Sequence, residues 1–142
     1  MSVFVEPFSE KYYDAARALW EGCEGVRLHD DCDSREAIAA YLERNPGLSY
    51  VAMSDGRMLG AVLCGHDGRR GYIHHLAVEP QARGQGIGRK LVDACLERLR
   101  ELGITRCHIF IVNANAEGIR FWERIGWWRR RDISIMSRDL PG

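Results

Sequence analysis

The sequence predicts a mixed α/β domain, built on one central sheet with helices on its faces. Short runs rich in β-branched and aromatic residues alternate with longer segments whose apolar residues recur every three or four positions. Asp55-Gly56 lies between two apolar runs, which is a strong hairpin signal. The order of these segments leads us to expect about six to seven strands flanked by about four helices.

The expected elements follow from the turn and cap residues between the periodic segments. Ser9 is expected to cap a first helix, Asn45-Pro46-Gly47 ends a second, and Gly103 ends a third. In chain order we expect a strand at 3–5, a helix at 9–23, an acidic loop at 27–34, a helix at 34–47, two strands within 49–65, a strand at 71–78, a helix at 86–102, a strand at 105–115, a helix at 115–126 and a last strand at 127–140. We interpret the whole chain as a single domain, 1–142.

Composition narrows the class of protein. Apolar residues make up 46% and charged residues 28% of the chain, which is ordinary for a folded domain. The formal net charge is zero, so composition gives no support for a nucleic-acid partner. No basic leader precedes an apolar run, and no apolar stretch is long enough for a bilayer, so we expect a cytoplasmic protein without a membrane partner.

The cysteine and histidine patterns argue against disulfides and metal. The five cysteines are scattered and include no C-x-x-C pair, so we expect reduced thiols that lie mostly in the core. The histidines lack the spacing of metal ligands, and no metal is expected. His74 and His75 are neighbours on a predicted strand, so regular alternation places them on opposite faces, unless a bulge near residue 76 disturbs it.

Residues 81–92, QARGQGIGRKLV, place three glycines within five positions at the start of a helical pattern. The free N–H groups of a helix N-terminus, with a dipole charge of roughly half an electron, favour an anion such as a pyrophosphate. The P-loop pattern is absent, and the dinucleotide pattern fails at its last position, which holds Arg89 or Leu91. The pattern [QR]-x-x-G-x-[GA] fits, with Arg83, Gly86 and Gly88 at its fixed positions.

Two segments carry a family resemblance. The segment LAVEPQARGQGIGRKLV is followed by NANAEGIRFWERIGW, and about 30 residues separate Gly86 of the first from Asn115 of the second. Together they resemble the acetyl-CoA motif and the downstream segment of the GNAT superfamily of N-acetyltransferases. The resemblance covers nearly the whole chain and is strongest over residues 72–128. It implies the GNAT fold and acetyl-CoA as co-substrate.

The resemblance also implies where the cofactor lies. In the family, main-chain amides of the glycine loop bind the pyrophosphate of coenzyme A. The strand before the loop separates from its neighbour at a bulge, and the pantetheine arm pairs with the exposed edge. The residues that the resemblance assigns to acetyl-CoA are Leu76, Ala77, Val78, Arg83, Gly84, Gln85, Gly86, Ile87, Gly88, Arg89, Asn115 and Trp122.

Acetyl transfer to an amine needs a group that takes up a proton. A free alkylamine has a pKa of about 10.4, so nearly all of it is protonated and unreactive at neutral pH. In some family members a histidine two positions before the Leu-Ala-Val triplet serves as the base, and His74 occupies that position. Simple packing or hydrogen bonding in the sheet is the other interpretation of His74, and it is the interpretation that we adopt for His75. The main-chain N–H of Val78 is the expected oxyanion donor.

Trp122 departs from the family pattern. The usual residue there is tyrosine, which can protonate the leaving thiolate, whereas an indole N–H cannot act as a proton-transfer acid. A thiol with a pKa of about 8.5 is still a fair leaving group, so we expect a slower or water-assisted enzyme. Trp122 is expected to pack on the pantetheine. A non-catalytic acyl-CoA-binding module is the alternative function.

The identity of the acceptor amine is the feature that the sequence indicates least clearly. Asp30, Asp31 and Asp33 of the expected acidic loop can attract a cationic amine, although a solvated loop is the simpler interpretation. Trp20, with Tyr12 or Tyr13, can add an aromatic wall, although core positions are the simpler interpretation. The sequence therefore predicts transfer of an acetyl group from acetyl-CoA to a primary amine of a small molecule or peptide, by direct attack in a ternary complex. A homodimer is a possible assembly, since dimers are the commonest.

Overall fold

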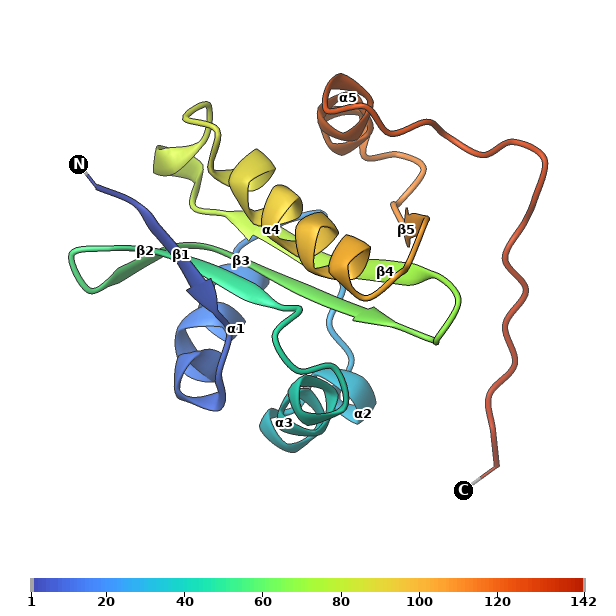
Figure 1. The fold of residues 1–142 in the computed structure, drawn as a ribbon, viewed down its shortest axis with the longest axis horizontal. Coiled ribbons are helices and arrows are strands. Elements are labelled where there is room, and N and C mark those ends of the chain that lie inside the picture. The colour runs from blue at the N-terminus through green and yellow to red at the C-terminus, as the bar shows by residue number, and fades with distance from the viewer. Residues whose placement is uncertain (1, 142) are drawn as a thin grey trace. The chain divides into compact units, whose positions relative to one another are not determined.

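A five-stranded mixed sheet organises residues up to Phe110 in the computed structural model, which describes residues 2–141 (Figure 1). The strands lie in the order β1-β2-β3-β4-β5; the first three neighbouring pairs are antiparallel, and β4 and β5 are parallel. The elements are β1 (Phe4–Pro7), η1 (Glu10–Tyr12), α1 (Tyr13–Glu21), α2 (Asp30–Asp33), α3 (Arg35–Arg44), β2 (Tyr50–Ser54), β3 (Arg57–His66), β4 (Gly71–Val78), η2 (Pro80–Ala82), α4 (Ile87–Glu101), β5 (Cys107–Ile109) and α5 (Ala116–Arg124).

The chain divides into two units, one ending at Phe110 and one beginning at Ile111. The sheet and the helices up to α4 belong to the first unit, and α5 belongs to the second. Each unit is described by itself. The single domain over residues 1–142 stays a prediction.

The hairpin between β2 and β3 confirms the expected turn. Asp55 and Gly56 have φ values of 50° and 76°, so both adopt the left-handed conformation that a two-residue type I′ turn requires. Asparagine, aspartate and glycine tolerate this conformation best.

The two faces of the sheet are covered by different helices. A Cβ at Gly71 would lie 2.5 Å from Leu99 of α4, so only glycine allows that helix to approach β4 so closely. A Cβ at Gly65 would lie 2.6 Å from the hydroxyl of Tyr41 in α3, on the opposite face. Beneath that second face, Trp20 of α1 and Ile38 of α3 are buried with Ala61 and other sheet residues in one core cluster. We call this the α1–α3 face.

The first half of the chain differs from expectation at two places. Ser9 precedes η1 but makes no side-chain cap hydrogen bond, whereas Ser34 caps α3 by accepting from the N–H of Ala37. The segment expected to be an acidic loop contains the short helix α2. The main-chain N–H of His29 donates to the Asp33 carboxylate and closes that turn, and acidic residues suit a helix N-terminus.

The prediction of a last strand at 127–140 is wrong. Residues 127–141 form neither strand nor helix, and the structure has five strands over the residues described, slightly fewer than expected. Ile133 and Ile135 alternate as in a strand, but both are exposed. Alternation alone does not make a strand, because a strand also needs a neighbour that satisfies its main-chain groups. β5 is likewise shorter than the expected 105–115.

Candidate active site

A bulge interrupts β4 two-thirds of the way along the strand. Leu63 of β3 pairs with His74, and Ala61 pairs with Ala77, so two residues of β4 lie opposite one residue of β3. The bulge lies at His75 and the residue after it, and His75 has a φ of 53°. A left-handed conformation is uncommon for a residue other than glycine, and uncommon backbone conformations are often found at functional sites.

The bulge brings His74 and His75 to the same side of the sheet. The ring of His74 lies 6.4 Å from the ring of Tyr41 in α3, and the ring of His75 lies 5.2 Å from that of Trp20 in α1. Both helices cover the α1–α3 face. The prediction that the two imidazoles point to opposite faces is therefore wrong. The left-handed residue turns the second histidine back toward the first, and their ring centroids are 6.5 Å apart.

A buried carboxylate holds the His75 ring. Asp33 is only 3% exposed, and its Oδ1 lies 2.8 Å from Nε2 of His75. The other carboxylate oxygen accepts from the main-chain N–H of His29 at 2.9 Å. The indole N–H of Trp20 donates to the carbonyl oxygen of His75 at 2.7 Å, which fixes the strained backbone as well. Local sequence patterns do not indicate this pairing, because the two partners are 42 residues apart.

The His74 ring is packed among aromatic side chains. Its ring packs edge-on against Tyr41 and also lies 6.0 Å from the ring of Phe110. Burial lowers the pKa of His74 below its usual value of 6.5, and the neighbouring His75 lowers the pKa further, while Asp33 partly opposes the shift. His74 is therefore an imidazole held in its neutral form near neutral pH, as a proton acceptor must be.

The far end of β4 has an open edge. Pairing with β5 ends at Ile73, while β4 continues to Val78. Beyond the strand, the N–H of Glu79 donates to the carbonyl of Leu59 at 2.8 Å. Hydrogen-bonded and non-hydrogen-bonded pairs alternate in an antiparallel ladder, so the neighbouring pair, Gly60 and Val78, points its N–H groups away from the partner strand. The Val78 N–H therefore faces the open edge.

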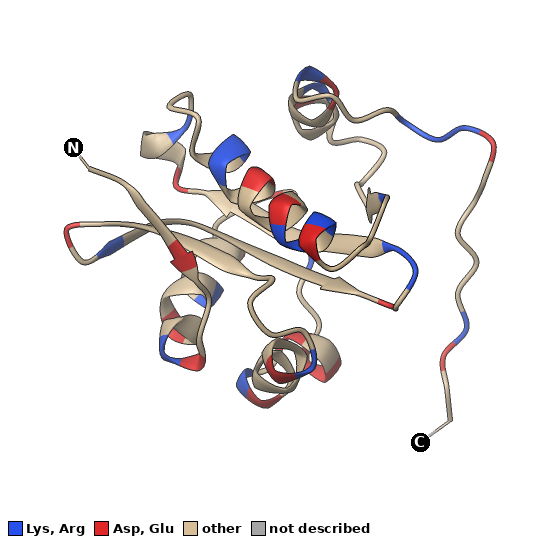
Figure 2. Ribbon diagram, viewed as in Figure 1, with Lys and Arg blue, Asp and Glu red and all other residues tan. Residues whose placement is uncertain are grey.

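The glycine loop follows that edge directly. Gly84 and Gly86 both have a φ of 80°, and Gly86 is the N-cap of α4 without a side-chain cap. The fifteen-residue helix α4 therefore begins at an exposed loop with left-handed glycines, and its first main-chain N–H groups lie next to that loop. Figure 2 shows basic residues in the first turn of α4. Gln85 and Arg89 are exposed, whereas Ile87 and Gly88 are buried against the sheet. Such an arrangement favours an anionic ligand.

The thiols are poorly suited to attack. Cys23, Cys64 and Cys95 are buried. Partial desolvation and the neighbouring Asp33 raise the pKa of Cys32 to about 11, and burial raises the pKa of Cys107 to about 12. A nucleophilic cysteine needs a lowered pKa, so neither of these two thiols is activated.

Comparisons with known proteins agree with this geometry. The model of the acetyltransferase (GNAT) family matches residues 10–127, most of the chain. The chain belongs to the GNAT family. An acetyltransferase of Pectobacterium atrosepticum is 30% identical over 118 residues, which cover 83% of this chain and 82% of that protein.

Solved structures show the same GNAT fold. Ard1 of Thermoplasma volcanium superposes with a TM-score of 0.78 at 20% identity, covering 89% of this chain and 82% of that one. The PaiA N-acetyltransferase of Thermoplasma acidophilum, solved with coenzyme A, gives a TM-score of 0.76 at 18% identity and covers 89% of each chain. This GNAT protein is an acetyl-CoA-dependent N-acetyltransferase, and acetyl-CoA is its co-substrate.

The second GNAT motif lies in the second unit, where its residues have local partners. The Asn115 side chain caps α5 by accepting from the N–H of Gly118 at 3.0 Å. The ring of Trp122 lies 4.7 Å from the ring of Trp127, edge to face, and its carbonyl accepts from the N–H of Trp127. The family resemblance implies that Asn115 and Trp122 both contact the cofactor. Those contacts stay predictions, and the structure adds a capping role and a packing role.

The predicted acceptor residues fall into two groups. Asp30 and Asp31 are exposed on α2, and Asp30 lies 3.6 Å from a guanidinium nitrogen of Arg17. Asp33 of the same helix is only 3% exposed and faces His75, so it does not lie on the surface with them. Trp20 has no exposed surface and belongs to the core beside His75. The aromatic wall is therefore not formed by Trp20 in this structure.

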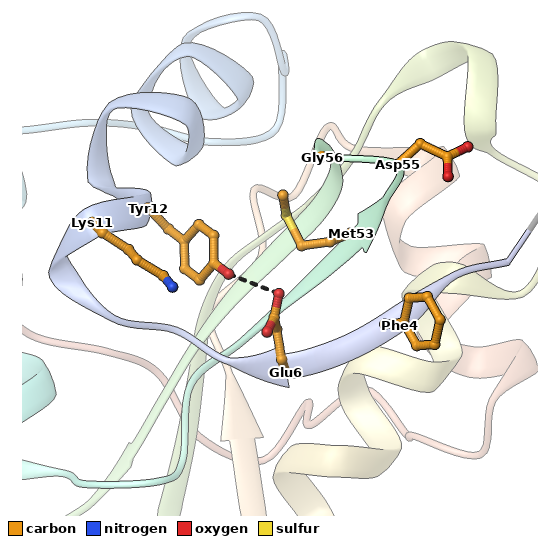
Figure 3. A pocket seen from close by; sticks show the side chains of 7 residues that line it. All are labelled: Phe4, Glu6, Lys11, Tyr12, Met53, Asp55 and Gly56. Atoms are coloured by element: carbon orange, nitrogen blue, oxygen red, sulfur yellow. Dashed lines mark hydrogen bonds between the residues drawn. The ribbon is translucent and has the colours of Figure 1, made fainter.

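A separate hollow of about 610 Å³ lies beside β1 (Figure 3). Tyr12 donates to Glu6 across it at 2.7 Å, and that hydrogen bond raises the pKa of Tyr12. None of the predicted cofactor-binding or catalytic residues lines it.

Among residues 2–141, no cluster of metal-binding side chains occurs, and no helix has the length and apolar character to cross a bilayer.

Proposed function

We propose that this GNAT protein transfers the acetyl group of acetyl-CoA to a primary amine, of a small molecule or a peptide, by direct attack in a ternary complex. The observation that carries the proposal is the open edge of β4, which ends at Val78 and continues into the glycine loop at the start of α4. An extended pantetheine can pair with that edge, and a pyrophosphate suits the loop.

The cofactor contacts fall along this path. The main-chain groups of β4 after the bulge receive the pantetheine, and the loop amides receive the pyrophosphate. Asn115 and Trp122 are proposed to contact the cofactor from the second unit. The proposed cofactor residues are Leu76, Ala77, Val78, Arg83, Gly84, Gln85, Gly86, Ile87, Gly88, Arg89, Asn115 and Trp122.

The chemistry at the thioester needs an oxyanion donor and a proton acceptor. The Val78 N–H is proposed to stabilise the carbonyl oxygen as the amine nitrogen attacks the carbonyl carbon. His74 is proposed to accept the proton that the amine loses, because burial keeps this imidazole neutral. The C–S bond then breaks, and the thiolate takes a proton from solvent, since Trp122 cannot supply one.

Direct attack is favoured over an acetylated enzyme. A covalent route needs an activated nucleophile, and the raised pKa values of Cys32 and Cys107 disfavour their thiolates. The exposed carboxylates of Asp30 and Asp31 are proposed to attract a cationic acceptor.

Steady-state kinetics test the proposal. Release of coenzyme A thiol is measured with a panel of polyamines, amino acids and peptide N-termini, while acetyl-CoA and the best amine are both varied. We expect turnover with at least one amine and intersecting double-reciprocal lines. Parallel lines would instead indicate an acetylated enzyme. Tight acetyl-CoA binding without turnover on any amine would favour the non-catalytic acyl-CoA-binding module.

A further inference from the structure

The pair formed by Asp33 and His75 combines two costly features at one place. His75 is held at a φ of 53°, although its neighbours on β4 form a regular strand on either side of the bulge. Asp33 places a carboxylate at 3% exposure, where a charge requires a partner. Glycine or asparagine at position 75 would make the same turn with less strain. Strain and a buried ionisable pair at one residue indicate a chemical role for the ring.

The contacts around Asp33 fix its orientation. One carboxylate oxygen accepts from the N–H of His29, and the other faces Nε2 of His75. Its own carbonyl accepts from the hydroxyl of Tyr13 at 2.6 Å and from Arg17 at 3.1 Å. Because an ionised carboxylate only accepts hydrogen bonds, Nε2 carries the proton in this contact, and Nδ1 is left with a lone pair when the ring is neutral.

The two imidazoles lie in different surroundings. His74 is surrounded by the rings of Tyr41 and Phe110, and burial disfavours its charged form. The Nε2 atom of His75 lies 2.8 Å from a carboxylate oxygen of Asp33, which faces the ring from α2. The charged and titratable groups near His74 come from three elements: Asp33 of α2, Tyr41 of α3 and His75 of β4. Burial raises the pKa of Tyr41, so its hydroxyl keeps its proton.

We propose that Asp33 and His75 form the final proton acceptor of the acetyl-transfer reaction, which receives from His74 the proton that the amine releases. This inference rests on the proposed function. The proton passes from the amine nitrogen to His74, then to Nδ1 of His75, while Nε2 keeps its proton toward Asp33. The ring centroids are 6.5 Å apart, too far for a direct hydrogen bond between the rings, so the proposed transfer requires a bridging water. His75 returns the proton to solvent, since 17% of its side chain is exposed.

The variants are chosen to distinguish the role of the His75 ring from the role of its left-handed backbone conformation. His75→Asn keeps a residue that tolerates the left-handed conformation and can hydrogen-bond Asp33, but it cannot hold the transferred proton. Asp33→Asn keeps the shape of the carboxylate and removes its charge. Glu43→Gln, on the exposed side of α3, is the matched charge control.

Two measurements are made on each folded variant of the full chain. With an amine that the wild type acetylates, we expect kcat to fall roughly 10- to 100-fold in His75→Asn and Asp33→Asn, with acetyl-CoA affinity within about twofold and Glu43→Gln unchanged. By NMR of labelled histidines, we expect His74 to titrate at a higher pH in His75→Asn, because His75, which lowers the pKa of His74, is then absent, while Asp33, which raises it, remains.

The outcomes distinguish the two proposals. A wild type that acetylates no amine overturns the proposed function itself. An active wild type with unchanged kcat in His75→Asn overturns the relay alone, because the left-handed backbone is then sufficient. An unmoved His74 titration in His75→Asn also overturns it, because the two rings would then be uncoupled.

Discussion

The guanidinium of Arg83 donates from Nε to the carbonyl oxygen of Val78 at 3.1 Å, which ties the glycine loop to the end of β4. The same side chain reaches the sulfur of Cys23 at 3.8 Å. The two parts of the proposed cofactor site are therefore held in fixed relation by one arginine.

Replacing Arg83 by methionine is expected to weaken acetyl-CoA binding about three- to tenfold, the loss of one hydrogen bond that positions the loop. Calorimetric titration measures the change. Arg100→Met, which removes an exposed ion pair with Glu97 on α4, is the control and is expected to bind normally. Equal affinity in both variants would contradict a positioning role for Arg83.

Gly86→Val tests the left-handed loop. A Cβ at Gly86 meets no atom within 4 Å, so the protein has room for the side chain, but a φ of 80° is strained for valine. Gly103 follows α4 with a φ of 84° and equally open surroundings, which makes Gly103→Val a matched control. Both variants are expected to lose about 1–2 kcal/mol of stability. Only Gly86→Val is expected to weaken acetyl-CoA binding, by about tenfold or more.

His74 is expected to link stability to pH. Its pKa is lowered in the folded protein, so the unfolded chain binds the proton more readily. The stabilisation is fully present above the usual value of 6.5 and is lost as the pH falls through the lower folded pKa. Thermal unfolding between pH 7.5 and 5 is therefore expected to show a smaller fall in Tm for His74→Gln than for the wild type. Parallel curves would mean that the buried imidazole does not contribute.

Gly65→Ala tests the packing of α3 against the sheet. The new Cβ would lie 2.6 Å from the Tyr41 hydroxyl and 2.8 Å from the Asn45 side chain, so both must shift. We expect a loss of about 1–3 kcal/mol in chemical unfolding. Gly22→Ala is the control, because its Cβ would meet only carbonyl oxygens at 3.7 Å. A Gly65→Ala protein as stable as the control would show that α3 adjusts freely.

Much of the fold followed from local patterns. The hairpin at Asp55-Gly56 and the helix after Gly86 depend on residues close in sequence, whose conformational preferences act wherever the chain is placed. The last strand failed because a ladder depends on a distant neighbour, which the alternation of Ile133 and Ile135 cannot specify.

The candidate site likewise has one part that local sequence predicts and one part that depends on residues far apart in the chain. The glycine loop could be predicted, since Gly84 and Gly86 are needed for their own backbone conformation. The partnership of Asp33 with His75 could not, because it depends on a bulge that reverses the alternation of β4 and on a short helix in a segment expected to be a loop. The bulge expected near residue 76 is the sequence feature that lies nearest to this pairing.

Amide NMR of the labelled protein, titrated with coenzyme A, tests the central claim most directly. If main-chain donors of the loop hold the diphosphate and β4 pairs with the pantetheine, the largest shifts fall on the amides of residues 84–89 and Val78. The amides of the hairpin at Asp55 and Gly56 should stay in place. Saturable binding that leaves residues 84–89 unshifted would contradict the proposed site.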